Sequence, residues 1–267
     1  MKNRDRPPTW LQALLRVYEE TSDPVQRVRM GRYIKAVKAS RTGLDLAEKV
    51  SFAFDGLDGR IAPLQRRGEV LEFLTRVAAE PPRRVLEVGT LRGGMLYLLA
   101  QVAAPGAKVI SVDLPYRGVG MGYPRWRASL FQAFGWPDRE VHLIHGDSHA
   151  RETIEVVRAT LGGAPLDLLF IDGDHSYAGV ARDFADYGGL VREGGIISMD
   201  GIEPRGEISC GTDQFWRDLE REYTCEAIVE ARKSGYGLGL LRKGSDHPFA
   251  LPLGLELPLM AASRGSG

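Results

Sequence analysis

The chain has 267 residues, of which 43% are hydrophobic and 26% charged, a balance typical of globular proteins. Lysine plus arginine and aspartate plus glutamate number 35 each, so no net field favours nucleic acid or an anionic membrane, and we expect neither as a partner. The two cysteines, Cys210 and Cys225, have no Cys or His neighbour at zinc-site spacing. No apolar run approaches the roughly 20 residues that span a bilayer, and the N-terminus lacks a signal-peptide pattern. These features predict a cytoplasmic protein with one large domain or two small ones.

The first 80 residues show apolar side chains at helical spacing. The pattern predicts helices over residues 10–18, 25–37 and 70–77, with a glycine-rich loop at 52–59. Residues 1–80 are therefore expected to form a helical N-terminal cap. This cap could pack on the core, close over a substrate or join two copies of the chain in a homo-oligomer.

From residue 84 onward, short apolar segments alternate with helical ones, which predicts βαβ units and a parallel sheet. We expect an α/β fold with a Rossmann-like, doubly wound, mostly parallel sheet over residues 81–244. A late segment at 238–241 is predicted to return as a terminal antiparallel strand. Residues 245–267 are rich in Pro, Leu and Gly and are assigned to a C-terminal tail. The expected strands are 85–88, 109–112, 141–144, 168–171, 196–199, 227–229 and 238–241, and the expected helices between and after them are 95–102, 126–134, 150–161, 177–190 and 213–223.

A glycine-rich connection follows the first predicted strand, where the carboxyl ends of parallel strands form the ligand-binding edge of a sheet. Gly89 and Gly93 let the backbone turn tightly and approach a ligand. Their spacing is not Gly-x-Gly-x-x-Gly, because Leu91 stands where a dinucleotide motif has glycine, so the diphosphate clamp of NAD enzymes is weakly supported. The carboxylate of Glu87 would oppose a phosphate and suits a cationic ligand.

The next two strands end in further acids. Asp113 stands where an acid commonly binds ribose hydroxyls, in nicotinamide and S-adenosylmethionine enzymes alike. Asp147 could accept a hydrogen bond from an adenine amino group, and Ser148 could donate one to a ring nitrogen. Alternatively, these two residues form an ordinary turn in which Ser148 caps the helix that begins near residue 150.

Four motifs at these strand ends carry a family resemblance. They are Val85-Leu86-Glu87-Val88-Gly89-Thr90, Ser111-Val112-Asp113-Leu114, Gly146-Asp147-Ser148-His149 and Phe170-Ile171-Asp172-Gly173-Asp174-His175-Ser176-Tyr177. Over roughly residues 65–243 the chain resembles the class I S-adenosylmethionine-dependent methyltransferases, in the branch of cephalosporin-hydroxylase-like proteins and macrolide sugar O-methyltransferases. The resemblance implies that the cofactor's amino acid and ribose lie among Glu87, Gly89, Gly93, Asp113 and Asp172, with its adenine near Asp147 and Ser148.

The same resemblance implies a metal site and a base. Asp172 and Asp200 match acids that bind magnesium in the macrolide sugar enzymes, and His175 matches their base. Met199 replaces one further acid of that set, which leaves two carboxylates and water to hold the cation, with Asp174 as a conceivable substitute. The chemistry is consistent, because a hydroxyl becomes nucleophilic when a cation lowers its pKa and a histidine takes its proton. The alternative for His175 is a residue at a helix N-terminus bonded to Asp172.

The sequence thus predicts an S-adenosylmethionine-dependent O-methyltransferase that acts on a hydroxyl of a small molecule, a sugar or a natural product. A divalent metal, most simply Mg²⁺, and the His175 base assist the reaction. Two alternatives stay open: an NAD-linked oxidoreductase, and a non-catalytic partner protein that binds the cofactor. The loop over residues 115–127 is long for its position and is expected to be a lid or a plain surface segment.

Overall fold

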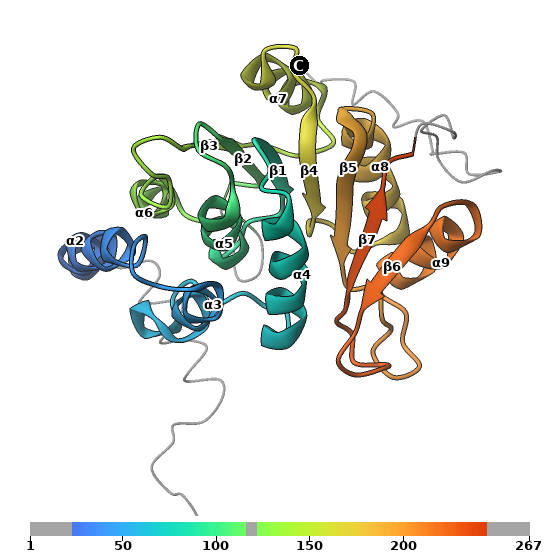
Figure 1. Ribbon diagram of the computed structural model, residues 1–267, viewed down its shortest axis with the longest axis horizontal. Helices are drawn as coiled ribbons and strands as arrows, with labels where there is room; N and C mark the ends of the chain where they lie inside the picture. Colours follow the sequence, from blue (N-terminus) through green and yellow to red (C-terminus); the bar gives the residue numbers. More distant parts are fainter. Residues whose placement is uncertain (1–22, 116–121, 245–267) are drawn as a thin grey trace, which may run out of the picture.

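The structure of the chain is a computed structural model, which describes residues 23–115 and 122–244 (Figure 1). The helix expected at 10–18, the C-terminal tail at 245–267, and residues 116–121 of the expected lid lie outside the described residues.

A seven-stranded sheet forms the centre of the molecule, in the order β3-β2-β1-β4-β5-β7-β6. Strands β1 to β5 are parallel, and β7 pairs antiparallel with both β5 and β6. The predicted Rossmann-like sheet with a late antiparallel strand is confirmed. This strand, β7, lies between β5 and β6, and β6 forms the edge. The strands are β1 (Arg84–Val88), β2 (Lys108–Asp113), β3 (Glu140–His145), β4 (Leu166–Ile171), β5 (Val191–Asp200), β6 (Cys225–Ile228) and β7 (Leu238–Arg242).

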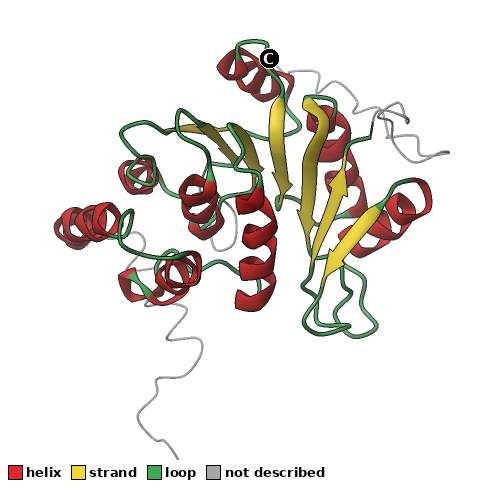
Figure 2. Ribbon diagram, viewed as in Figure 1, coloured by secondary structure: helices red, strands yellow, loops and turns green. Residues whose placement is uncertain are grey.

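Helices cover both faces of this sheet (Figures 1 and 2). Packed on one face are α2 (Asp23–Ala39), α3 (Leu46–Asp55), α4 (Arg67–Ala79), α5 (Gly94–Val102) and α6 (Ala128–Gln132), with the short turns η1 (Leu57–Gly59) and η2 (Arg125–Arg127). On the other face are α7 (Arg151–Leu161), α8 (Tyr177–Gly188) and α9 (Thr212–Glu222). Each face has its own hydrophobic core.

The helices of the predicted N-terminal cap share the first of these cores with the sheet. Tyr33 of α2, Val50 of α3 and Phe73 of α4 are buried in one continuous cluster with Val85 and Phe170 of the strands. The helices expected at 25–37 and 70–77 are present as α2 and α4. The division of the chain at residue 80 stays a prediction.

The glycine-rich loop expected at 52–59 is wrong for most of its length, because α3 continues to Asp55 and η1 follows. Asp45 explains why the helix forms there. Its side chain accepts a hydrogen bond from the backbone of Glu48, and the Glu48 side chain accepts one from the Asp45 backbone, which is a capping box. Val50 and Ala53 then bury the inner face of α3.

Side-chain alternation along the strands aims the candidate acids at one face. Val85 and Phe170 belong to the core under α4 and α5, while Leu86 and Ile171 belong to the opposite core. Because the side-chain period of a strand is two, Glu87, Asp172 and Asp200 have the parity of the α4–α5 face. The carboxyl ends of the strands are also level, since Val88 pairs with Val112 on one side and with Ile171 on the other.

Within residues 23–115 and 122–244, none of the helices combines the length and the apolar character that crossing a bilayer requires.

Candidate active site

A cavity of about 660 Å³ opens at the carboxyl ends of β1 to β4. Its wall contains almost all of the residues predicted from the sequence to bind a cofactor or act as a base: Glu87, Gly89, Gly93, Asp113, Asp147, Ser148, Asp172 and His175. Asp200, the remaining candidate, is not in the wall but lies beside Asp172 and His175. The structure therefore brings the candidate residues to a single edge of the sheet.

The loop after β1 has its shape because of two glycines. Gly89 has a φ of 87°, and a Cβ there would lie 2.0 Å from the backbone oxygen of Asp172. Gly93 has a φ of 85°, and a Cβ there would lie 2.5 Å from the ring of Phe131. Both positions require a residue without a side chain. The loop backbone can consequently lie close against β4 and line the cavity.

Glu87 is fully buried at the floor of the cavity. Its Oε2 accepts a hydrogen bond of 2.7 Å from Thr90 Oγ1, whereas Oε1 has no partner among the described residues. Burial raises the pKa of this carboxyl well above its usual value, and the nearby acids Asp172 and Asp113 add to the shift. A buried acceptor without a partner is costly, so the site is suited to a ligand that brings hydrogen-bond donors and positive charge. The amino group of S-adenosylmethionine fits that requirement.

Asp113 ties the glycine loop to β2. Its Oδ2 accepts the backbone N–H groups of Thr90 at 3.1 Å and Leu91 at 2.7 Å, and its Oδ1 accepts that of Leu114 at 2.7 Å. Burial raises the pKa of the carboxyl, and these hydrogen bonds partly offset the effect. A carboxylate oxygen can accept two hydrogen bonds, so Oδ1 keeps one position for a ligand hydroxyl. The predicted contact with ribose is compatible with this arrangement and stays a prediction.

The loop after β3 contributes Asp147, Ser148 and His149 to the wall. Asp147 Oδ1 accepts the backbone N–H of His149 at 2.9 Å. The alternative in which Ser148 caps α7 is wrong, since Ala150 occupies the N-cap position of that helix without a side-chain cap bond.

Sequence reasoning missed Asp183, which is fully buried in α8 with Oδ1 3.2 Å from His149 Nε2. Its placement between the apolar positions of α8 is the one signal that could have indicated a buried polar role.

Asp172, His175 and Asp200 form a compact cluster, in which one possible ligand atom from each residue lies within 4.8 Å of the others. His175 Nε2 is 3.2 Å from Asp172 Oδ1. This hydrogen bond raises the pKa of His175 to about 9, despite partial burial. Asp200 is 7% exposed, and its Oδ1 has no partner in the described part of the chain. Burial and the charge of Asp172 raise the pKa of Asp200 well above its usual value.

The donor set of this cluster fits a divalent cation. Two carboxylates that face each other in a buried place repel unless a cation or a proton separates them. Met199, which replaces an acid of the resembling family, has the opposite strand parity and is fully buried in the core under α8 and α9. Asp174 is not part of this cluster, and its Oδ1 accepts the backbone N–H of Ser176 at the start of α8.

Gln65 is a further residue of the cluster that the sequence did not indicate. It precedes α4, is 5% exposed, and donates a hydrogen bond of 2.8 Å from Nε2 to Asp172 Oδ2. The two residues are 107 positions apart, and no local motif surrounds Gln65, so the pattern of the sequence carried no signal for it.

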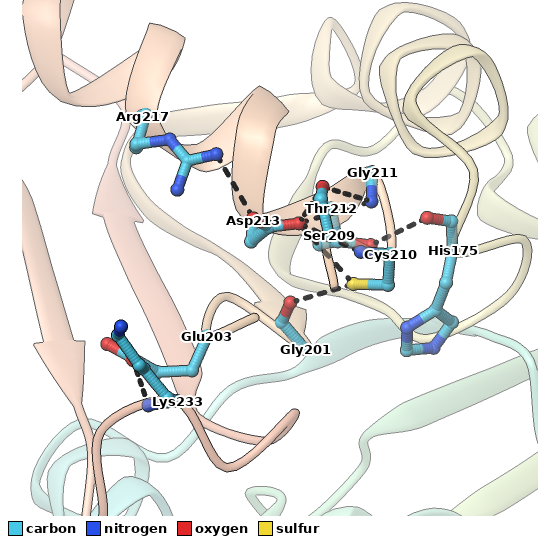
Figure 3. A network of polar contacts seen from close by, with 10 residues as sticks. All are labelled: His175, Gly201, Glu203, Ser209, Cys210, Gly211, Thr212, Asp213, Arg217 and Lys233. Carbon is cyan, nitrogen blue, oxygen red and sulfur yellow. Dashed lines mark hydrogen bonds and ion pairs between the residues drawn. The ribbon is translucent and has the colours of Figure 1, made fainter. Parts of the chain in front are cut away.

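The turn before α9 supports His175 from behind. Asp213 Oδ1 accepts hydrogen bonds from the Ser209 hydroxyl at 2.6 Å and from the backbone of Cys210 at 3.1 Å. The turn held in this way donates the backbone N–H of Thr212 to the carbonyl of His175 at 3.1 Å. Figure 3 shows this carbonyl facing the turn while the imidazole points away from it. The backbone of His175 is thus held by a turn that is distant in sequence, while its ring contacts Asp172 nearby in the chain.

The strand order defines the class. A dinucleotide-binding sheet of the order 3-2-1-4-5-6 ends in a parallel strand, whereas here an antiparallel strand separates β5 from β6. Residues 86–202 match the protein family described as "Methyltransferase domain". The core of this chain has a Rossmann-like methyltransferase fold, and residues 86–202 are similar to that family.

One relative in sequence and two solved structures are similar to this chain. The chain is 32% identical over 154 residues to a catechol O-methyltransferase of Mycobacterium tuberculosis (strain ATCC 25618 / H37Rv), in a match that covers 58% of this chain and 63% of the relative. The fold of this chain is similar to that of an O-methyltransferase from Bacillus cereus in complex with SAH, with a TM-score of 0.54 and 18% identity. The match covers 78% of this chain and 96% of the Bacillus cereus chain. The fold is also similar to that of the O-methyltransferase TomG from Streptomyces achromogenes in complex with SAM, with a TM-score of 0.50, 19% identity and coverage of 76% and 91%.

Proposed function

We propose that the protein transfers a methyl group from S-adenosylmethionine to a hydroxyl of a small molecule, with the help of a divalent cation. The observation that carries the proposal is the cluster of Asp172, His175 and Asp200 at the rim of the cofactor-sized cavity. The names of the catechol O-methyltransferase and of the two structural neighbours support transfer to oxygen.

The cavity residues divide into those that hold the donor and those that receive the acceptor. S-adenosylmethionine, when bound, supplies an electrophilic methyl group. The unpartnered Oε1 of Glu87 accepts from its ammonium, and Asp113 Oδ1 accepts from a ribose hydroxyl. Asp147 and Ser148 follow the end of β3, the strand next to β2, and line the part of the cavity where the adenine is expected. Holding the donor in this orientation supplies much of the rate, because transfer then becomes effectively unimolecular.

The acceptor is activated at the acidic cluster. Asp172 and Asp200 would hold a divalent cation, most simply magnesium, which when bound would lower the pKa of an acceptor hydroxyl. His175 is the base that takes the proton. With its pKa at about 9, the imidazole carries a proton at neutral pH and cannot accept another. Its hydrogen bond to Asp172 is the main cause of that shift, so His175 becomes a competent base when the Asp172 carboxylate is engaged elsewhere.

Two acceptor classes should be tested first. The curated relative acts, by its name, on catechols, which present a phenolic hydroxyl. TomG is involved in tomaymycin synthesis, and the branch that the sequence resembles methylates sugars, so natural products and their sugars form the second class. The branch itself stays a prediction.

The decisive experiment measures methyl transfer from labelled S-adenosylmethionine to catechols and to glycosylated natural products, with added Mg²⁺ or with EDTA. We expect transfer to at least one class, loss of transfer in EDTA, and loss of transfer in His175→Ala. His142→Ala is the matched control, because His142 lies on β3 outside the cavity and bonds Glu140. Calorimetry should show that both variants still bind S-adenosylmethionine.

Each opposite result contradicts a different part of the proposal. Turnover that is unchanged in EDTA contradicts the metal, and full turnover by His175→Ala contradicts the base. Tight cofactor binding with no transfer to any acceptor of either class would instead favour a non-catalytic cofactor-binding protein.

A further inference from the structure

Gln65 is a buried polar group in the cavity wall to which the proposed mechanism gives no role. Its side chain is 5% exposed and lies in the short segment between η1 and α4. A buried amide needs partners for both of its ends. Its nitrogen donates to Asp172 Oδ2, so this end is directed at the acidic cluster.

The amide contacts one of the two acids directly. Asp172 uses Oδ1 for His175, at 3.2 Å, and Oδ2 for Gln65, at 2.8 Å. One possible ligand atom of Asp200 lies within 4.8 Å of those of Asp172 and His175, and Asp200 Oδ1 stays buried without a partner in the described residues. Gln65 therefore contacts Asp172 at the edge of a cluster that still lacks a partner for Asp200.

A carboxamide beside two carboxylates can act in two ways, as a hydrogen-bond donor or as a metal ligand. With the nitrogen toward the acids it donates hydrogen bonds and separates two negative groups. After a half-turn of the amide, the oxygen stands where the nitrogen stood, and the two ends are nearly equal in size. Amide oxygens are good ligands for hard cations such as Mg²⁺ and Mn²⁺.

The spacing of the groups is compatible with a shared cation. Adjacent ligands of an octahedral magnesium ion are about 2.9 Å apart. The separation between Gln65 Nε2 and Asp172 Oδ2 is 2.8 Å, so an oxygen at the amide end would stand at that spacing from the carboxylate. Met199 supplies no ligand, because it faces the opposite core. A neutral amide oxygen adds a ligand without adding a third negative charge to a buried site.

We propose that Gln65 is a metal ligand, whose amide turns its oxygen toward a divalent cation shared with Asp172 and Asp200. The inference rests on the proposed function and deepens it, because it gives the cation three protein ligands and leaves His175 free for the proton. It also makes the segment before α4 part of the catalytic centre.

Manganese binding measured by electron paramagnetic resonance tests the proposal without any acceptor. Gln65→Met keeps the length of the side chain but removes both amide ends, and it should weaken Mn²⁺ binding at least tenfold. Gln65→Glu keeps an oxygen and loses the donor, and it should bind Mn²⁺ at least as tightly as the wild type. If Gln65 were only a hydrogen-bond donor to Asp172, Gln65→Glu would weaken binding as Gln65→Met does, and the proposal would be overturned.

Two controls keep the outcome readable. Gln132→Met changes an exposed glutamine on α6, outside the cavity, and should leave Mn²⁺ binding unchanged. S-adenosylmethionine affinity and circular dichroism, unchanged in all three variants, would show that the fold is intact. A wild type that binds S-adenosylmethionine but no Mn²⁺ contradicts the metal of the proposed function together with this inference. A wild type and a Gln65→Met variant that bind Mn²⁺ equally contradict this inference alone.

A crystal grown with Mn²⁺ gives the direct answer. The anomalous peak should lie in direct contact with the Gln65 amide oxygen as well as with both carboxylates. A peak from which Gln65 is separated by a water molecule would overturn the proposal.

Discussion

Replacing Gly89 by alanine tests whether the loop after β1 owes its shape to the close approach of β4. Alanine at the φ of 87° observed there costs about 1 kcal/mol for the left-handed conformation alone. The added Cβ would also lie 2.0 Å from the backbone oxygen of Asp172 and 2.8 Å from the backbone nitrogen of Gly173. Neither of these backbone atoms can rotate away, so the two loops must separate.

That separation disrupts the hydrogen bonds on either side of the new methyl group. The nitrogen of Asp172 donates to Val88 at 2.8 Å, and the nitrogen of Gly89 donates to Val112 at 2.9 Å. Each is worth about 1 kcal/mol, so we expect Gly89→Ala to lower the free energy of unfolding by about 3 kcal/mol in total. Cofactor affinity should fall as well, because the loop lines the cavity.

Gly162→Ala is the matched control. Gly162 ends α7 with a φ of 62°, and none of the described atoms lies within 4 Å of the place that an alanine methyl would take there. This variant should therefore lose only about 1 kcal/mol, from the backbone conformation. Urea denaturation of both variants measures the difference. If Gly89→Ala is no less stable than Gly162→Ala, the close approach of β4 does not constrain the loop.

Three further predictions concern single contacts. NMR titration should give His175 a pKa of about 9, and the Asp172→Asn variant should bring this pKa down toward the usual imidazole value. Because the pKa is raised in the folded state, the His175–Asp172 pair stabilises the protein below neutral pH and loses that effect as the pH rises through about 9. An unchanged His175 pKa in the variant would refute the assignment. Asp213→Asn should lower the free energy of unfolding by about 2 kcal/mol. Burial raises the pKa of Asp213, but its hydrogen bonds hold the pKa below its usual value overall, so the stabilisation is present at neutral pH and lost in acid. Equal acid-denaturation midpoints for the variant and the wild type would count against this prediction. Tyr97→Phe removes the 2.8 Å hydrogen bond to Ser40, so thermal denaturation should show a loss of about 1 kcal/mol in the free energy of unfolding, with cofactor affinity unchanged. A large drop in cofactor affinity would be inconsistent with the position of Tyr97 in the core.

The strand-end residues could be predicted because they depend on local pattern. The apolar run before Asp172 indicates a buried strand, and the topology of parallel sheets then assigns Asp113 and Asp172 to the same edge. Strand parity could have gone further. Asp200 shares the parity of Asp172 relative to the two cores, whereas Met199 does not, so the loss of an acid at 199 says little about the site that Asp200 joins.

What the sequence could not indicate are contacts between distant segments. Gln65 meets Asp172, and Asp183 meets His149, through packing of whole elements rather than through any motif. The error at 52–59 has a different origin. Two glycines there suggested a loop, but the capping box at Asp45 and the burial of Val50 favour the helix over that local preference.

The position of Gln65 also bears on how the protein folds. Its partner Asp172 follows it by 107 residues, and contacts of such long range form late because closing the intervening chain is entropically unfavourable. The pairing of β1 with β4 spans a similar separation, since Val85 pairs with Leu168. The contact of Gln65 with Asp172 should consequently form with the central strand pairs, so a probe attached to this segment would report closure of the sheet rather than formation of the local helices.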